Sequence, residues 1–234
     1  MMRKSKYLSK KDIENEATLF LNQYYPISLI KPSILNLEDI IESKLNLKLE
    51  YQQLDEKGNV LGMTVFKTGY LPVISENQEI EKIVAQQGTI ILNSILADDI
   101  KQQNRYQFTL AHEIGHWILQ RKELLYDENQ TSLFDTIQDL SEKDSIKCLN
   151  RSVNPEYNTL ITDLDWLEWQ ANYFASAILM PKIIFLKELS KLNFCTEENR
   201  ILELSKIFGV SKQAVRNRIN SLQNKDKLNN QIEF

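Results

Sequence analysis

Cysteine is scarce in this sequence: Cys148 and Cys195 are the only two among 234 residues. Two cysteines are too few for a disulfide framework and are not spaced as a C-x-x-C pair, so we interpret both as isolated reduced thiols. Long apolar runs are absent too, because stretches such as 175–181 fall far short of a membrane span. No apolar segment follows the basic residues 1–11, as it would in a secretory signal. We therefore expect a cytoplasmic protein.

A large excess of either charge is also missing, since 28 Lys and Arg residues face 32 Asp and Glu residues, for a formal net charge of −4. This balance does not indicate a protein that coats nucleic acid or an anionic membrane. Hydrophobic residues make up 42% of the chain and charged residues 26%, which is ordinary for a globular protein with a sizeable core. The length suggests one domain, or one domain with a small appendage.

The pattern of apolar residues predicts both helices and strands. A helical period is present at 12–25, 37–45, 106–120, 164–180, 197–208 and 211–222. Alternating patterns between turn residues predict strands at 47–51, 59–66, 70–75 and 89–93, and so a small, mainly antiparallel sheet. Residues 122–160 show no clear period, and an irregular insertion of that length is usually functional or mobile. We predict an α+β fold with a small sheet and several helices.

Histidine is as scarce as cysteine, yet His112 and His116 stand together in the pattern H-E-x-x-H. Positions i and i+4 share one helix face, so both imidazoles can bind a single zinc ion. Zinc lowers the pKa of a bound water to roughly 7, and Glu113 is placed to take its proton as a general base. Gly115 would allow another backbone segment to approach closely. Manganese also suits such a site.

The alternative is that the two histidines lie on the surface of an ordinary amphipathic helix. Against it, the flanking residues 108–111 and 117–119 are strongly apolar, so the histidines are expected among buried positions. Buried imidazoles need polar partners, and a metal ion supplies one for both.

A catalytic zinc ion takes three protein ligands and leaves the fourth position to water. With no third histidine in the chain, the third ligand must be a carboxylate or a cysteine, which excludes the metzincin pattern. Glu168 is the strongest candidate, because Asn172 one helical turn later could hydrogen-bond the outer nitrogen of a ligating histidine. The rivals are Asp163, Asp165 and Cys148.

Two segments resemble the motifs of the ImmA/IrrE family of metallopeptidases. Residues 105–116, RYQFTLAHEIGH, are similar to the active helix of that family. Residues 168–176, EWQANYFAS, followed by LMP at 179–181, are similar to its second motif, E-x-x-A-(N/D)-x-F-A ending in L-(M/V)-P. The resemblance implies zinc ligation by His112, His116 and Glu168, with Glu113 as general base. It also implies a gluzincin-like, and hence zincin-like, metallopeptidase core, with an N-terminal helical and small β layer packed against an α-helical bundle.

Members of this family typically cleave a helix-turn-helix transcriptional repressor that governs mobile elements, prophages or stress-response genes. The resemblance therefore implies a zinc metallo-endopeptidase whose partner protein is such a repressor. An extended substrate could pair with the strand at 89–93. Tyr106, Tyr157 and Tyr173 are candidates for the group that stabilises the oxyanion. The alternative is a non-catalytic regulator on the same metalloprotein fold, which binds DNA or another protein.

Residues 204–219 resemble a helix-turn-helix, since Gly209 suits the turn and Ser211 is a good N-cap. Residues 205–228 include six Lys or Arg and one Asp, a local charge of +5. They could form a DNA-reading helix with Lys212, Arg216 and Arg218 exposed. The alternative, which we favour, is a helical appendage whose charges are merely solvated. We place the zincin-like domain at 1–195 and the helix-turn-helix-like helices and polar tail at 196–234.

Overall fold

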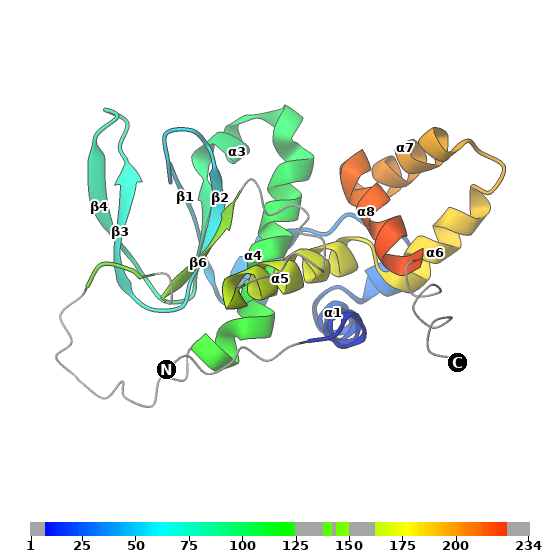
Figure 1. Ribbon diagram of the computed structural model, residues 1–234, viewed down its shortest axis with the longest axis horizontal. Helices are drawn as coiled ribbons and strands as arrows, with labels where there is room; N and C mark the ends of the chain where they lie inside the picture. Colours follow the sequence, from blue (N-terminus) through cyan, green and yellow to red (C-terminus); the bar gives the residue numbers. More distant parts are fainter. Residues whose placement is uncertain (1–7, 125–137, 142–143, 150–161, 224–234) are drawn as a thin grey trace.

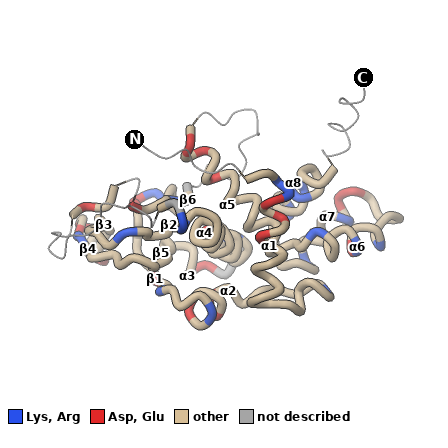
Figure 2. The backbone as a smooth tube through the Cα atoms, turned by 90° about the horizontal axis from the view of Figure 1, so that it is seen from below, with Lys and Arg blue, Asp and Glu red and all other residues tan. Residues whose placement is uncertain are grey.

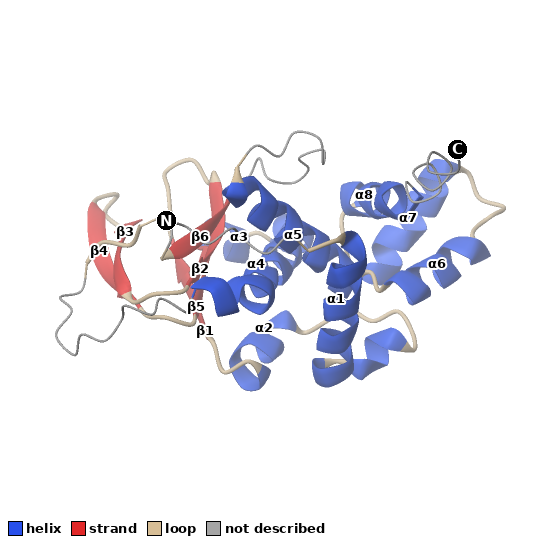
Figure 3. Ribbon diagram, turned by 60° about the horizontal axis from the view of Figure 1, so that its bottom comes forward, coloured by secondary structure: helices blue, strands red, loops and turns tan. Residues whose placement is uncertain are grey.

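The computed structural model describes residues 8–124, 138–141, 144–149 and 162–223. It is a mixed α and β structure, compatible with the predicted α+β class. The strands gather at one end of the molecule and the last three helices at the other, with two long helices between them (Figures 1 and 3). No helix in the described ranges is long and apolar enough to span a membrane.

A four-stranded sheet in the order β1-β5-β2-β6 forms the core of the strand layer. Strand β1 (Lys48–Gln52) pairs in parallel with β5 (Thr89–Asn93), and β2 (Val60–Val65) pairs antiparallel with both β5 and β6 (Ser145–Leu149). A separate antiparallel pair joins β3 (Gly69–Ile74) to β4 (Ile80–Ala85). The prediction of a mainly antiparallel arrangement is thus confirmed.

Strand β5 is central in this sheet, which contradicts one expectation. All five of its residues are buried, and β1 and β2 occupy its two edges. Its backbone groups are therefore already hydrogen-bonded, and it cannot pair with an extended substrate. The prediction that the strand at 89–93 binds substrate is wrong, because the order of strands cannot be read from the alternating pattern alone.

The helices follow the predicted periods closely, and capping residues explain where two of them begin. Ser9 and Asp12 form a capping box at the start of α1, and Thr162 and Asp165 form another at the start of α5. The α-helices are α1 (Lys10–Tyr24), α2 (Leu37–Asp39), α3 (Ser94–Asp98), α4 (Gln103–Leu124), α5 (Asp163–Leu179), α6 (Lys182–Lys191), α7 (Glu197–Phe208) and α8 (Lys212–Gln223). Short turns of other helix types lie at Pro26–Leu29, Ile40–Lys44 and Ile100–Gln102.

Four of these helices and strands were not predicted: α3, α6, β4 and β6. Strand β4 is mostly exposed and lacks an apolar face, so no alternation marks it. Strand β6 lies inside 122–160, which we expected to be irregular throughout. Only Met180 and Pro181 separate α6 from α5, so the sequence pattern indicated the end of one helix at Pro181 and did not indicate a second helix after it. The rest of 122–160 falls largely outside the described residues.

Helices α4 and α5 cross in close contact because Gly115 has no side chain. A Cβ added at Gly115 would lie 3.1 Å from both the Cα atom and the carbonyl oxygen of Ala171. Such a distance is tighter than ordinary van der Waals contact, so glycine is required for this approach. The expected close backbone approach at Gly115 is confirmed, and it brings the histidine face of α4 against α5.

Helices α7 and α8 share the main hydrophobic core. Leu204, Phe208 and Val215 belong to the same cluster of buried side chains as residues of α1, α4 and α5. Gly209 ends α7 in the left-handed conformation, at φ 63°, which suits glycine at the turn between the two helices. The domain boundary between 195 and 196 stays a prediction.

Candidate metal centre

The three side chains expected to bind a metal converge between α4 and α5. The Nε2 atoms of His112 and His116 lie 2.8 Å apart. Glu168 lies against both rings, with Oε2 3.4 Å from His112 Nε2 and Oε1 3.1 Å from His116 Nε2. Both histidines are fully buried, and Glu168 is 9% exposed. The structure thus brings His112, His116 and Glu168 into one cluster that could hold a metal ion.

Side-chain amides hold the outer nitrogens of both imidazoles. His112 Nδ1 lies 3.0 Å from Asn172 Oδ1, the contact predicted for Asn172. His116 Nδ1 lies 2.6 Å from Gln120 Oε1. The Gln120 amide nitrogen donates to the Leu167 carbonyl, which fixes the amide oxygen toward His116. Because an amide oxygen only accepts, each Nδ1 carries a hydrogen, and each Nε2 of a neutral ring presents a lone pair to the cluster.

Four atoms with lone pairs therefore meet at one point: two Nε2 atoms and both oxygens of Glu168. The Glu168 oxygens are buried and have no hydrogen-bond partner in the described part of the chain. Buried hydrogen-bond acceptors that face one another make the free energy of folding less favourable unless a cation lies among them. Two ligands of a tetrahedral zinc ion lie about 3.3 Å apart. The separations of 2.8, 3.1 and 3.4 Å are close to this value, so the residues fit a divalent metal ion.

Glu113 is fully buried on α4 and faces strand β2. The Thr64 hydroxyl donates to Glu113 Oε2 at 2.6 Å, while Oε1 has no hydrogen-bond partner among the described residues. Gly62, two residues before Thr64 and on the same strand face, leaves room for this carboxylate. A Cβ at Gly62 would lie only 2.8 Å from Glu113 Oε1. Strand β2 therefore orients Glu113 through one oxygen and leaves the other able to accept a proton.

Burial and charge shift the pKa values of the cluster in different directions. Burial acts to raise the pKa of Glu168, but the two adjacent histidines hold it well below its ordinary value. Burial acts to lower the pKa of His112, but Cys148 and Glu168 beside it raise it well above its ordinary value. Burial raises the pKa of Glu113 despite the opposing histidines. Glu168 is thus held ionised, as a ligand must be, and Glu113 is shifted toward the range of a general base.

A second cluster shares His112 with the first. Cys148 on β6 is buried. Ligand atoms of His112, Glu113 and Cys148 all lie within 4.8 Å of one another. The register pairs Cys148 with Gly62, and residues directly opposite in a sheet point to the same face. Cys148, a rival for the third ligand, therefore lies beside His112 and Glu113 but does not join the group of His112, His116 and Glu168.

The two aspartate rivals lie away from the histidines. Asp165 accepts hydrogen bonds from the backbone and hydroxyl groups of Thr162, in the capping box of α5. Asp163 is exposed in the first turn of the same helix. Neither joins a potential metal-binding group in the ranges that the structure describes. Of the proposed carboxylates, only Glu168 meets the histidines.

Two of the tyrosines considered for the oxyanion direct their hydroxyls elsewhere. Tyr106 donates to Glu38, and Tyr173 donates to Glu14 at 3.0 Å. Burial, aided by these carboxylates, raises the pKa of both phenols. The expectation that either hydroxyl faces the metal cluster is therefore wrong. Tyr157, the third candidate, lies outside the described residues.

The basic residues of α8 differ sharply in exposure. Lys212 and Arg216 are exposed, whereas Arg218 is fully buried (Figure 2 marks the charged positions). Arg218 donates to the Glu14 carboxylate at 2.7 and 3.1 Å and to the Met180 carbonyl at 3.1 Å. The expectation that Arg218 is exposed to nucleic acid is wrong, because its side chain ties α8 to α1 and to the end of α5. A DNA-binding role of Lys212 and Arg216 stays a prediction.

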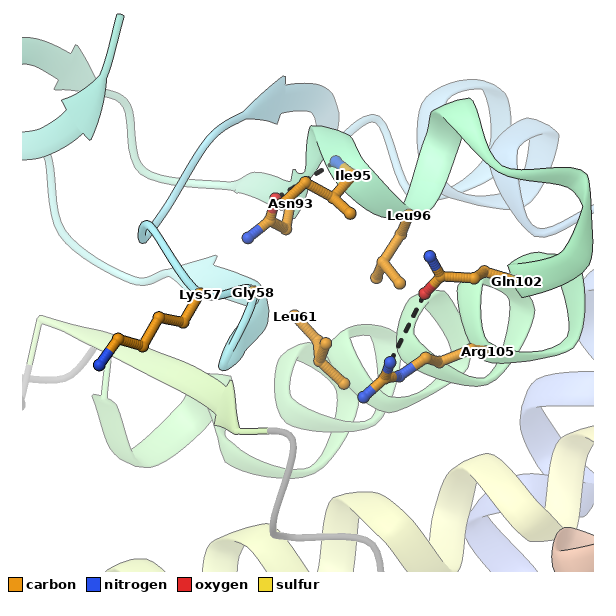
Figure 4. A pocket seen from close by; sticks show the side chains of 8 residues that line it. All are labelled: Lys57, Gly58, Leu61, Asn93, Ile95, Leu96, Gln102 and Arg105. Carbon is orange, nitrogen blue, oxygen red and sulfur yellow. Dashed lines mark hydrogen bonds between the residues drawn. The ribbon is translucent and has the colours of Figure 1, made fainter. Parts of the chain in front are cut away.

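A small pocket of about 170 Å³ lies near the start of α4 (Figure 4). Its walls come from the turn before β2, the end of β5, α3 and the first turns of α4, through Lys57, Gly58, Leu61, Asn93, Ile95, Leu96, Gln102 and Arg105. None of these residues belongs to the metal cluster, and Asn93 donates within the fold, to the Val60 carbonyl. The pocket is therefore separate from the chemical centre.

Three residues that orient the site were not expected from the sequence: Gly62, Thr64 and Gln120. Gln120 lies four residues after His116, so its helical spacing was a signal that could have indicated it. Thr64 lies 49 residues before Glu113, and only the packing of β2 on α4 brings them together. No local pattern marks Gly62 or Thr64.

Residues 156–220 match the Peptidase M78 family model, whose description is IrrE N-terminal-like domain. The matched segment includes Glu168 and Asn172, and the H-E-x-x-H helix precedes it. A comparison with curated proteins found no match. The family match supports the ImmA/IrrE assignment that the motifs indicate, and with it a metallopeptidase.

Proposed function

We propose, from the premise that the chain belongs to the ImmA/IrrE family, that it is a zinc-dependent endopeptidase acting on a specific partner protein. The family match and the His112, His116 and Glu168 cluster support this proposal. Zinc is the ion we favour for two imidazoles and one carboxylate, and manganese also suits that ligand set. The partner we propose is a helix-turn-helix transcriptional repressor of a mobile element, a prophage or a stress response.

Glu113 is the proposed general base. A zinc ion in the site would polarise the scissile carbonyl and lower the pKa of the attacking water. Glu113 Oε1 would accept the proton of that water and later pass it to the leaving amine. The Thr64 hydroxyl would hold the other oxygen and so keep the carboxylate turned toward the reaction.

Asn172 and Gln120 are the proposed positioning residues. By accepting from the Nδ1 hydrogens of His112 and His116, they would hold both rings with Nε2 toward the ion. Their amides touch no substrate in this proposal, so their contribution lies in metal affinity.

The unpartnered Oε1 atom of Glu113 is the observation that carries the proposal. A non-catalytic protein on the same fold would need the metal ligands for its stability. It would not need a general base between the two histidine ligands. A fully buried carboxylate oxygen without a hydrogen bond destabilises the fold, and such groups are typical of catalytic sites. Gly62 and Thr64 leave room for this carboxylate and hold it in place.

We propose strand β6, in place of β5, as the strand that pairs with an extended substrate segment. One edge of β6 pairs with β2, and no strand in the described ranges pairs with its other edge. The sulfur of Cys148 on this strand lies within 4.8 Å of a ligand atom of His112, so a peptide added along the outer edge would pass close to the metal cluster.

The proposal is tested by co-expressing the full chain with the repressor encoded beside its gene. We expect cleavage by the wild type in the presence of zinc and none by Glu113→Gln, which keeps the size of the side chain but cannot accept the proton. Removing a general base costs roughly 10²- to 10⁴-fold in rate. Glu168→Ala should also be inactive, through loss of the ion. Absence of cleavage by the wild type, or full biological activity of Glu113→Gln, would overturn the peptidase assignment.

The alternative function is a regulator that binds DNA through α8. Exposed Lys212 and Arg216, on the helix after the turn at Gly209, favour it. The full chain would then bind duplex DNA in a salt-sensitive and sequence-selective way, and Lys212→Ala and Arg216→Ala would weaken that binding. Binding that is unaffected by both substitutions would exclude this reading.

A further inference from the structure

We propose that Cys148 is a fourth ligand of the metal site and closes the position that a catalytic water needs. The three-ligand set of His112, His116 and Glu168 leaves one position open. Cys148 stands next to it on β6, a strand that belongs to neither of the two helices that carry the other ligands. Ligation by Cys148 does not depend on the proposed peptidase function. Its consequence, an enzyme held in a latent state, does rest on that function.

The geometry around His112 supports this ligation. Cys148 is 7% exposed, and its sulfur lies within 4.8 Å of a ligand atom of His112, the residue that the two possible metal-binding groups share. Its partner in the sheet register is Gly62, which has no side chain and faces the Glu113 carboxylate on α4. The thiol therefore lies in the same buried space as the histidine, and a thiolate is a strong zinc ligand, with a bond of about 2.3 Å.

A second observation also indicates a ligand at this point. Glu113 is fully buried, and its Oε1 atom lacks a hydrogen-bond partner in the described part of the chain. This atom belongs to the Cys148 group, in which all ligand atoms lie within 4.8 Å of one another. Cys148 is part of the main hydrophobic cluster, and its sulfur also lies close to two groups that can bind a metal ion, the His112 imidazole and the Glu113 carboxylate.

The proton balance of the closed state follows from the same contacts. When the Cys148 sulfur binds the ion, its S–H bond breaks, and Glu113 Oε1 receives the proton. One ligation therefore closes the fourth position and leaves the general base protonated. When water displaces the sulfur, the thiolate takes the proton back from Glu113, and both requirements of the hydrolysis are restored. No oxidant or reductant takes part.

The test uses cobalt(II) as a spectroscopic substitute for zinc in the full chain and needs no substrate. A cysteine ligand gives an intense sulfur-to-cobalt charge-transfer band in the near ultraviolet, which histidine and carboxylate ligands do not give. We expect this band in the wild type, its loss in Cys148→Ser, and its retention in Cys195→Ser. Cys195 is the matched control, because it is the only other cysteine and is not part of either metal-binding group.

Zinc affinity provides the second readout. Removing a ligand should weaken binding at least as much as removing an outer partner does, roughly 10- to 100-fold. Competition with a chelating dye should show this loss for Cys148→Ser and none for Cys195→Ser. A wild-type cobalt spectrum without the band would overturn the proposal by itself, so a variant that fails to fold does not leave it open. Persistence of the band in Cys148→Ser would overturn it equally.

These results separate the ligation from the peptidase function. A cobalt band in a chain that cleaves no repressor would leave Cys148 as a ligand of a closed site and would reject the peptidase. Repressor cleavage without the band would keep the peptidase and reject the fourth ligand. If both hold, zinc-saturated Cys148→Ser should cleave the repressor faster than the wild type, because the fourth position is then open to water.

Discussion

Two buried polar clusters in this protein have opposite chemistry. At the α4–α5 contact, two imidazoles and one carboxylate present lone pairs to one another, and the Glu168 oxygens have no hydrogen-bond partner in the described ranges. At the α1–α8 contact, Arg218 pairs with both oxygens of Glu14 and donates to the Met180 carbonyl. The first cluster contains no lysine or arginine among the described residues, whereas the second contains Arg218.

This difference separates a binding site from a structural tie. A buried network whose donors and acceptors are all matched stabilises one packing arrangement and has nothing left to offer a ligand. A buried network made of acceptors needs a partner from outside the chain. In the sequence, the basic residues around α8 indicated DNA binding, and the histidine motif indicated metal binding. Of the two clusters, the histidine cluster is the one whose buried acceptors lack partners among the described residues.

The largest expected effect comes from breaking the complete cluster. Arg218→Met should lower the free energy of unfolding by about 3 kcal/mol, because it removes the cation that pairs with the largely buried Glu14 carboxylate and leaves it only the Tyr173 hydroxyl. Arg216→Ala, two residues earlier and exposed, is the matched control and should change it by less than about 0.5 kcal/mol. Chemical denaturation of the three proteins measures both values. Equal stability of the two variants would remove the structural role assigned to Arg218.

Removing the carboxylate from the incomplete cluster should have a smaller effect on folding and a large one on metal binding. Glu168→Gln should weaken zinc binding by more than about 100-fold, beyond the range for outer partners, because the third ligand loses its charge. Asp163→Asn, exposed on the same helix, should bind zinc as the wild type does. Titration calorimetry compares the three. Equal weakening by both substitutions would point to a general charge effect.

A moderate loss is expected when the imidazole orientation is released. Gln120→Leu keeps the side-chain size but removes the oxygen that accepts from His116 Nδ1. Zinc affinity should fall roughly 10- to 100-fold, as it does for other outer partners of metal-bound histidines. Gln213→Leu, at an exposed position of α8, serves as the control. Unchanged affinity for Gln120→Leu would mean that helix packing alone orients the ring.

The smallest effect is expected at the exposed charges of α8. The double substitution Lys212→Ala with Arg216→Ala should leave zinc affinity and repressor cleavage unchanged, because neither side chain belongs to the metal site. Cleavage of the co-expressed repressor, quantified over time, checks this. A marked loss of cleavage at unchanged metal content would make α8 part of the substrate-binding surface.

The sequence predicted contacts between side chains that lie one turn apart on the same helix. The spacings His112–His116 and Glu168–Asn172 place groups on one helix face, and the histidine shortage demanded a carboxylate. Contacts that join different elements were not predictable in this way. Thr64 reaches Glu113 only because β2 packs on α4.

Strand order and burial were equally invisible in the sequence. The pattern of β5 is that of a buried strand, but nothing in it shows that β1 and β2 take both of its edges. Arg218 looks like its exposed neighbour Arg216 in a basic helix. Only Glu14, 204 residues away, explains its burial.

The most direct test of the central claim is the metal content of purified Glu113→Gln beside that of Glu168→Ala. If Glu168 is a ligand and Glu113 only a base, Glu113→Gln should hold one zinc ion per chain, like the wild type, and cleave no repressor. Glu168→Ala should hold none after the same dialysis. A wild type without zinc, or a Glu113→Gln protein that loses its metal as Glu168→Ala does, would contradict the account.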